Sequence, residues 1–166
     1  FVPRPPSWDP HSWSGGSWSP LVDCVLCANP GPMTLEGTNT WGLSAPGSSS
    51  CIVIDPGPIG ATHRRAVLDH VGDRRVALTL LTHDHPDHAA GAADFAAEAS
   101  CPVRAIGDGH DDLSDGDVVR SSGVELLVVT TPGHSADSIS FCLTAENALL
   151  TGDTILGWGT TVVLWP

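Results

Sequence analysis

The chain has 166 residues, enough for one domain with a substantial core and too few for two comfortable ones. Seven basic residues, all arginine, against 19 acidic residues give a net charge of −12, so a large basic face for nucleic acid is excluded. Hydrophobic residues make up 41%, which excludes a wholly disordered chain, and no apolar run reaches the roughly 18 residues of a membrane-spanning helix.

Residues 1–20 are rich in proline, serine and tryptophan. Ser-Trp pairs recur with a period of five at Trp8, Trp13 and Trp18, and this period is neither that of a helix nor that of a strand. The composition predicts a disordered tail, with an aromatic recognition segment as the alternative. We therefore expect the folded domain to occupy residues 21–166.

Apolar runs and turn residues predict that strands and helices follow the tail in alternation. Strands are expected at residues 22–27, 38–43, 51–54, 76–81, 102–106, 117–120, 125–130, 138–143 and 148–150, and helices at 61–71 and 88–99. The final run TTVVLWP also has the composition of a strand, and the chain stops inside it. Helices between particular strands favour an α/β sandwich with the sheets inside.

The five cysteines do not form a disulfide framework. They are Cys24, Cys27, Cys51, Cys101 and Cys142. The C-x-x-C spacing of the first two is compatible with a zinc or redox site, but no second pair follows, and the apolar surroundings favour two buried cysteines in a strand. An odd number of cysteines indicates a reducing compartment, so we expect a cytoplasmic location.

Residues 82–88 read THDHPDH and lie between a predicted strand and a predicted helix. Neutral imidazole and carboxylate groups are preferred ligands of zinc and similar divalent ions. A turn leaving the strand could point His83 and His85 to one side and Asp87 and His88 to the other, giving two adjacent ligand pockets. A solvated turn with an Asp helix cap is the alternative, but a cap explains none of the histidines.

Two later strand ends carry further ligand types. The sequence TPGH ends one predicted strand at His134, and TGD ends another at Asp153. Sites in α/β sheets are assembled where strands end. We therefore expect His134 and Asp153 to join the cluster of residues 82–88.

These motifs resemble the signature of the metallo-β-lactamase superfamily. The residues that carry the resemblance are THDHPDH at 82–88, TPGHS at 131–135, TGD at 151–153 and VIDPG at 53–57. Residues 29–41 and 155–163 are similar to the lactamase-β-like branch, which includes endoribonucleases for single-stranded RNA. The resemblance covers residues 22–165 and implies a four-layer αββα sandwich whose C-terminal part is missing.

The resemblance also implies two adjacent metal sites. The implied ligands are His83, His85 and His134 for one ion, Asp87 and His88 for the second, and Asp153 as the bridge between them. Asp55 would support a ligand without binding metal, and Asp87 would also be the catalytic residue. Two zinc ions per complete protein are expected, and iron or manganese would suit the same donors. The family's last histidine ligand would lie beyond residue 166.

The implied chemistry is hydrolysis by a metal-activated water. The branch resemblance suggests RNA phosphodiesters as substrates, although the charge of −12 makes this chain a poor RNA platform. A thioesterase similar to hydroxyacylglutathione hydrolase is the alternative, and an inactive metal-binding fragment is another. The expected partner is a small-molecule or single-stranded RNA substrate, with no membrane.

Overall fold

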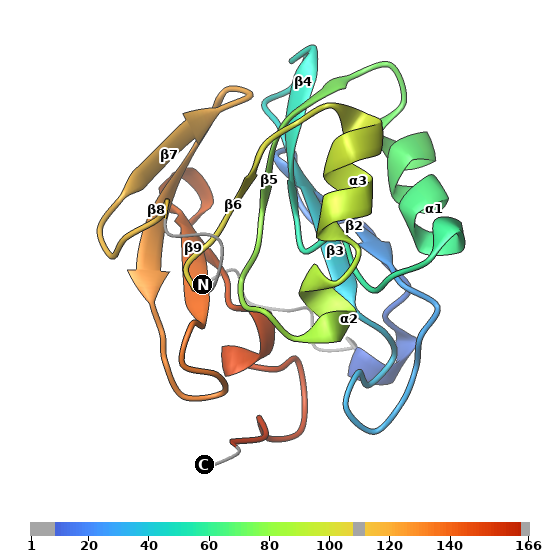
Figure 1. Cartoon of the computed structure of the whole chain (residues 1–166), viewed down its shortest axis with the longest axis vertical. Coiled ribbons are helices and arrows are strands. Elements are labelled where there is room, and N and C mark those ends of the chain that lie inside the picture. Colours follow the sequence, from blue (N-terminus) through green and yellow to red (C-terminus); the bar gives the residue numbers. More distant parts are fainter. Residues whose placement is uncertain (1–8, 108–111, 164–166) are drawn as a thin grey trace.

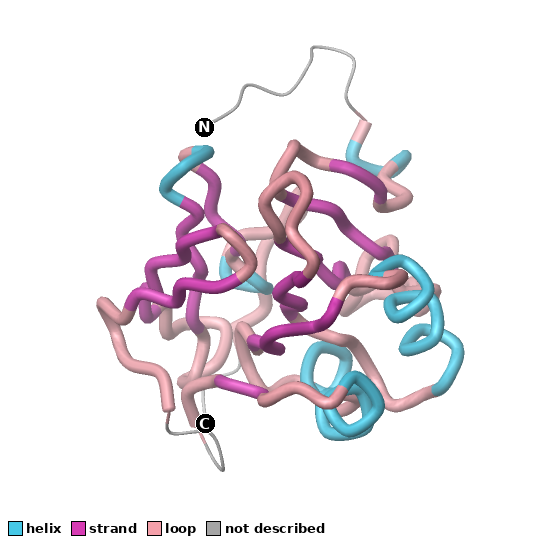
Figure 2. Tube along the Cα trace, turned by 90° about the horizontal axis from the view of Figure 1, so that it is seen from above, coloured by secondary structure: helices cyan, strands magenta, loops and turns pink. Residues whose placement is uncertain are grey.

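The computed structural model describes residues 9–107 and 112–163 and shows two β-sheets packed face to face (Figures 1 and 2). The six-stranded sheet has the order β1 (Gly16–Ser17), β2 (Val22–Leu26), β3 (Asn39–Leu43), β4 (Ser50–Ile54), β5 (Arg75–Leu80) and β6 (Val103–Arg104). The four-stranded sheet has the order β10 (Ala148–Leu150), β9 (Ile139–Leu143), β8 (Val124–Thr130) and β7 (Val118–Ser121). Strands β4, β5 and β6 are parallel, and all other neighbours are antiparallel.

Three helices cover the outer face of the six-stranded sheet, as Figure 1 shows. They are α1 (Ala61–Val71), α2 (Pro86–Ala89) and α3 (Ala92–Ala99). The described residues thus form a sheet–sheet–helix stack. The expected α/β sandwich with the sheets inside is confirmed, and these three layers are the part of the predicted four-layer sandwich that the described residues contain.

The core lies in two layers, one on each face of the six-stranded sheet. Ile52 and Ile54 of β4 pack with Leu126 and Phe141 of the other sheet, and all four are fully buried. Residues of β4 with the opposite orientation, such as Val53, pack against side chains of the helices. Because both faces of β4 are covered, its apolar residues run continuously instead of alternating with polar ones.

The expected strands appear within two residues of their predicted bounds, but the helix predicted at 88–99 is divided. A helix begins at Pro86, where the missing N–H of proline costs nothing, and ends at Ala89. Gly91 separates it from α3 and packs tightly on the chain after β4. A Cβ on Gly91 would stand 2.6 Å from the Pro58 carbonyl oxygen, so this close approach requires glycine.

The structure differs from the expected disordered tail over residues 9–20. A 3₁₀ turn at Pro10–Ser12 leads into β1, which pairs with β2 in an antiparallel register. Trp13 donates its indole N–H to Asn39 Oδ1 at 2.7 Å and lies beside Trp41, with ring centroids 6.3 Å apart. Strand pairing and tryptophan packing therefore outweigh the proline- and serine-rich composition here. Residues 1–8 lie outside the described residues.

The chain after residue 159 also differs from its prediction. Residues 160–163 form a loop instead of a strand, and residues 164–166 lie outside the described ranges. The loop contacts the sheet ends: Thr161 donates its hydroxyl to the carbonyl of Asp153 at 2.5 Å, and the Val162 carbonyl accepts a bond from His134. These contacts hold the loop in place without strand pairing.

Cys24 and Cys27 are buried, as their apolar surroundings predict, and all five cysteines are free. None of the described helices combines the length and apolarity needed to cross a membrane. The cytoplasmic location stays a prediction.

Candidate metal centre

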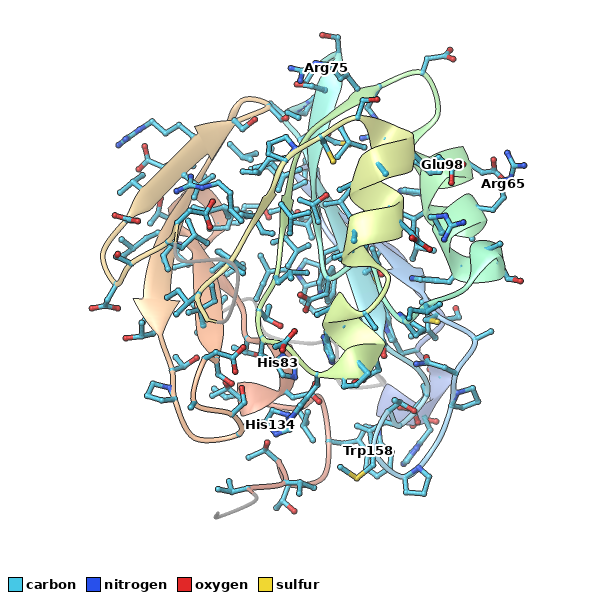
Figure 3. The ribbon with its side chains drawn as sticks, in the orientation of Figure 1. Arg65, Arg75, His83, Glu98, His134 and Trp158 are labelled. Atoms are coloured by element: carbon cyan, nitrogen blue, oxygen red, sulfur yellow. The ribbon has the colours of Figure 1, made fainter. Side chains whose placement is uncertain are left out.

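All six predicted ligands meet at one end of the sandwich, where loops of both sheets come together. Residues 82–88, here called the histidine loop, follow β5, whereas His134 lies between β8 and β9. Asp153 lies in a 3₁₀ turn, Gly152–Thr154, directly after β10. Figure 3 shows His83 and His134 close together at this end, opposite to Arg75. The site is therefore built at strand ends, as expected for an α/β protein.

One group of potential ligands consists of three histidines. Nitrogen atoms of His83, His85 and His134 all lie within 4.8 Å of one another. His134 Nε2 is 2.8 Å from His85 Nδ1, and His134 Nδ1 is 2.7 Å from the Val162 carbonyl oxygen. Because a carbonyl only accepts, Nδ1 of His134 carries the proton, and Nε2 directs its lone pair toward the group.

A second group lies next to the first and shares a residue with it. Ligand atoms of His83, His88 and Asp153 also lie within 4.8 Å of one another. Asp153 stands between the groups, with Oδ1 3.4 Å from His88 Nε2 and Oδ2 3.7 Å from His134 Nε2. Asp87 is not in either group of three, but its Oδ2 is 3.3 Å from His88 Nε2. The motifs alone did not indicate that His83 belongs to both groups.

Asp55, which directly follows β4, sets the orientation of two of these histidines. Its carboxylate accepts the backbone N–H and the hydroxyl of Thr82, both at 2.7 Å, and Nδ1–H of His88 at 2.9 Å. Since the Thr82 hydroxyl donates to Asp55, it accepts from His83 Nδ1 at 3.0 Å. Both His83 and His88 therefore use Nδ1 in this network and present Nε2 to the cluster.

The surroundings of the Nε2 atom of His83 indicate whether a metal ion fits between these side chains. It is buried, and it has no hydrogen-bond partner among the described residues. A buried polar atom without a partner is costly in a folded protein. A divalent ion would use this lone pair together with the neighbouring imidazoles and the Asp153 carboxylate, which are the donors that zinc prefers. The residues present thus fit a metal ion.

Burial and neighbouring charges shift the pKa values of three groups in the cluster, in different directions. Burial, helped by the nearby His88, lowers the pKa of His83 to about 4, so His83 is neutral at pH 7. Burial raises the pKa of Asp87, but bonds with His88 and Thr38 outweigh this effect and lower it to about 2. Burial also disfavours the charged form of His88, yet the carboxylates of Asp55, Asp153 and Asp87 raise its pKa. The carboxylates around His88 thus favour a positive charge at this point, and a metal ion bound there would take the place of the proton on His88.

The other described histidines lie elsewhere. His63 is buried in the core, where its Nε2 is 2.7 Å from the Thr40 hydroxyl, so it is a hydrogen-bonded structural residue. His11 and His70 are exposed and pair with Glu36 and Asp23.

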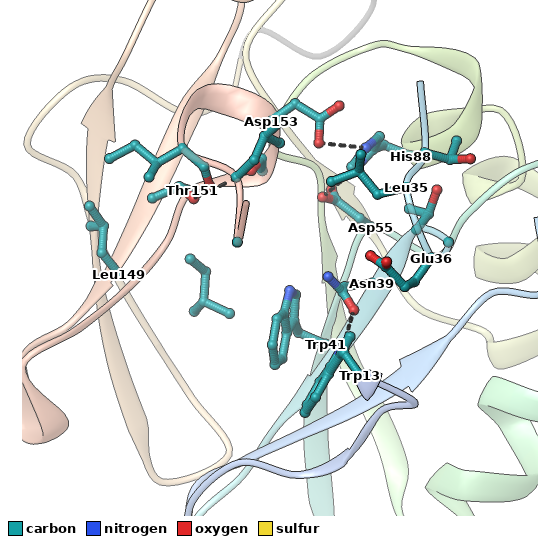
Figure 4. A pocket seen from close by; sticks show the side chains of 18 of the residues that line it. Trp13, Leu35, Glu36, Asn39, Trp41, Asp55, His88, Leu149, Thr151 and Asp153 are labelled. Carbon is teal, nitrogen blue, oxygen red and sulfur yellow. Dashed lines mark hydrogen bonds and ion pairs between the residues drawn. The ribbon is translucent and has the colours of Figure 1, made fainter. Parts of the chain in front are cut away.

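A cavity of about 560 Å³ opens beside the second ligand group (Figure 4). Asp87, His88 and Asp153 line it together with tryptophans of the N-terminal segment and of β3. The sequence motifs did not indicate that these tryptophans belong to a site. The available signal was the Ser-Trp repeat, which is compatible with aromatic recognition as well as with a tail.

Comparisons with known proteins identify the family to which this chain belongs. The profile of the "Metallo-beta-lactamase superfamily" matches residues 34–117 and 105–165. Thioesterase pkgB of Emericella nidulans is 38% identical over 150 residues, covering 86% of this chain and 44% of the relative. An atrochrysone carboxyl ACP thioesterase of Aspergillus chevalieri is 37% identical over 153 residues, covering 87% and 49%. The chain spans about half the length of these curated relatives.

Solved structures show the same fold. A metallo-beta-lactamase family protein from Thermus thermophilus has a TM-score of 0.71 at 23% identity, covering 90% of this chain and 64% of that one. ETHE1 from Myxococcus xanthus has a TM-score of 0.66 at 23% identity, covering 82% and 58%. The resemblance drawn from the sequence motifs is confirmed, and the chain belongs to the metallo-β-lactamase superfamily.

Proposed function

We propose that this chain carries the metal centre of a hydrolase that cleaves thioesters. The observation that carries the proposal is the pair of ligand groups that share His83 beside a cavity large enough for an organic substrate. Relatives with 37–38% identity are named thioesterases, which favours a thioester among the substrates of this family.

In this proposal the ligands are the members of the two observed groups together with Asp87. His83, His85 and His134 would hold one ion, His88 and Asp87 would hold a second, and Asp153, which lies between the two groups of side chains, would be available to both. A divalent ion bound there would lower the pKa of a bound water and polarise the carbonyl under attack. Zinc suits these nitrogen and oxygen donors, and iron or manganese would also suit them.

Asp87 has a second role in this proposal, as the residue that orients the attacking water. Its carboxylate is ionised at neutral pH and half-buried, and the Thr38 hydroxyl holds Oδ2 at 3.1 Å. A fixed carboxylate can accept a hydrogen bond from water and aim it at a bound carbonyl. Because the pKa of Asp87 is so low, orientation suits it better than keeping the proton.

RNA phosphodiesters, the substrate suggested by the branch resemblance, are less well supported. The relatives described above are named for thioester hydrolysis, and the charge of −12 repels a polyanion. The experiment below includes RNA so that this alternative is measured directly.

The test compares metal content and turnover in matched variants. The 166-residue chain is loaded with zinc, its metal is measured by mass spectrometry, and hydrolysis of S-acyl-N-acetylcysteamine is followed by release of the thiol. His83→Ala should lose bound metal and thioesterase activity, because His83 belongs to both ligand groups. His70→Ala removes an exposed histidine of α1 and is the matched control.

Equal metal content in the two variants would refute the metal centre. Cleavage of single-stranded RNA without thioester hydrolysis would show that the substrates are RNA phosphodiesters and not thioesters. Bound metal without turnover of either substrate would support the inactive metal-binding fragment instead.

A further inference from the structure

The cavity beside the metal centre has an aromatic wall that no step of the proposed hydrolysis uses. Trp13 and Trp18 of the N-terminal segment and Trp41 of β3 line it. The rings of Trp13 and Trp41 are 6.3 Å apart and tilted by 30°, and Trp18 meets Trp13 edge-on at 6.3 Å. Figure 4 shows Trp13 and Trp41 together on one side, with Leu149 on the other and His88 and Asp153 at one end.

A hydrogen bond fixes the Trp13 ring of the aromatic wall. The indole N–H of Trp13 donates to Asn39 Oδ1 at 2.7 Å, and the Cys24 thiol donates to the same oxygen at 3.2 Å. Asn39 and Cys24 lie on β3 and β2, so the N-terminal segment is attached to the sheet at this point. A wall held in this way keeps its shape before a ligand arrives, which lowers the ordering cost of binding.

The rim of the cavity is closed where the two ends of the described chain meet. Glu36 accepts the indole N–H of Trp158 at 2.9 Å, and its other oxygen is 3.1 Å from His11 Nδ1. The His11 ring also packs on Trp158, with centroids 4.4 Å apart. Residues 9–18 are therefore anchored at two points, Asn39 and Glu36, and both anchors border the cavity.

The volume and the lining indicate what the cavity would hold. An apolar cavity of about 150 Å³ holds one benzene ring, so about 560 Å³ has room for several fused rings. Flat aromatic groups stack favourably on tryptophan. A carbonyl attached to such a group would reach the end of the cavity that His88, Asp87 and Asp153 line.

We propose that Trp13, Trp18 and Trp41 form an acyl-binding subsite, through which residues 9–18 select substrates with a bulky aromatic acyl group. This proposal rests on the proposed thioester hydrolysis and names the part of the substrate that the cavity recognises. The N-terminal segment is then a specificity element of the domain.

A binding measurement tests the subsite without any turnover. The probe is 2-acetonaphthone, which has a naphthalene ring beside a carbonyl and no bond to hydrolyse, titrated into the 166-residue chain by calorimetry. Trp13→Ala should weaken binding about tenfold, because a stacking partner and its buried area are lost. Trp13→Phe should weaken it less. Ile59→Ala, which truncates a side chain that is 74% exposed and outside the cavity lining, is the control and should not change binding.

Turnover of two thioesters separates this proposal from the proposed function. With S-naphthoyl- and S-acetyl-N-acetylcysteamine, Trp13→Ala and Trp18→Ala should lower kcat/KM for the naphthoyl substrate about tenfold more than for the acetyl substrate. An equal loss of kcat/KM for the two substrates would overturn the subsite while leaving thioester hydrolysis intact. Unchanged binding of 2-acetonaphthone to both Trp13→Ala and Trp18→Ala would do the same. If the probe binds as predicted but neither thioester is cleaved, the proposed function fails and the apolar site stands. Thermal unfolding of each variant shows whether it is folded. If Trp13→Ala is misfolded, its loss of probe binding and of activity is set aside, and the results for Trp18→Ala test the subsite.

Discussion

Replacing Asp55 by asparagine would reverse the hydrogen-bond network that aims two histidines at the metal centre. Asp55 is only 2% exposed and accepts three hydrogen bonds, two from Thr82 and one from His88. An asparagine keeps one acceptor oxygen but places an N–H₂ donor against the Thr82 hydroxyl and His88 Nδ1. Asparagine also tolerates the positive φ of 54° at this position, so the backbone stays unstrained.

The consequence is a change of tautomer in the ligands. If position 55 donates to His88 Nδ1, the proton of the neutral ring moves to Nε2, the atom that faces Asp87 and Asp153. The Thr82 hydroxyl would likewise turn to donate to His83 Nδ1, which moves the proton of His83 onto its buried Nε2. A protonated nitrogen cannot bind a metal, so both ligand groups weaken together.

Mutation of a residue that hydrogen-bonds to a metal-ligating side chain typically lowers metal affinity about 10- to 100-fold. Asp55→Asn should therefore weaken zinc binding by about 1.4–2.7 kcal/mol. Competition with a chromophoric chelator measures this affinity in the variant and in Asp69→Asn, which changes an exposed aspartate of α1. Zinc affinity of Asp55→Asn within twofold of the Asp69→Asn control would refute the tautomer argument.

Three further changes test other parts of the structure. Asp87→Asn should lower kcat at least about 100-fold while the chain stays folded by circular dichroism, since the side chain is partly exposed and lines the cavity outside the hydrophobic core. Turnover at the parent rate would show that Asp87 is misassigned. Gly152→Ala should lower the free energy of unfolding in urea by about 1–3 kcal/mol, because the new Cβ would stand 2.5 Å from the Thr82 hydroxyl at a residue whose φ is +50°. Gly133→Ala is the control and should lower this free energy much less, because no atom lies within 4 Å of its new Cβ. Burial raises the pKa of Cys24 to about 12, so about one part in ten thousand of this thiol is thiolate at pH 8. Iodoacetamide should therefore label Cys24 only after denaturation, where its pKa falls back to 9.0. Rapid labelling of Cys24 itself in the native chain, located by peptide mass spectrometry, would contradict this burial.

The local sequence predicted the strands and the positions of the candidate ligands well because both depend on short-range patterns. A strand that is buried on both faces has a continuous apolar sequence, and the histidine loop follows such a strand, predicted at residues 76–81 and found as β5 at Arg75–Leu80. Positions at strand ends therefore placed His134 and Asp153 correctly beside the loop. The membership of His83 in both groups depends on ring orientations that Asp55 sets from another strand, and no sequence spacing contains that information.

The N-terminal segment shows the limit of composition as a guide. Residues 9–18 have the proline and serine content of a tail, but their order depends on partners about 25 positions away, such as Asn39 for Trp13 and Glu36 for His11. Long-range contacts of this kind are invisible to local propensity. The five-residue repeat of Ser-Trp was the one sequence feature that pointed to aromatic packing.

The two sheets together determine how far apart the ligands stand. The histidine loop belongs to the six-stranded sheet, whereas His134 and Asp153 belong to the four-stranded sheet, so the core between the sheets sets the size of the metal centre. Two hydrogen bonds join the sheets beside the ligands: Ile139 N–H donates to the Thr82 carbonyl, and Asp84 N–H donates to Asp137 Oδ2, both at 2.8 Å. Since these bonds and the packed core position the candidate ligand atoms in advance, binding of an ion in the proposed site would require little further ordering of the chain. In this proposal, core packing between the sheets is therefore coupled to metal affinity.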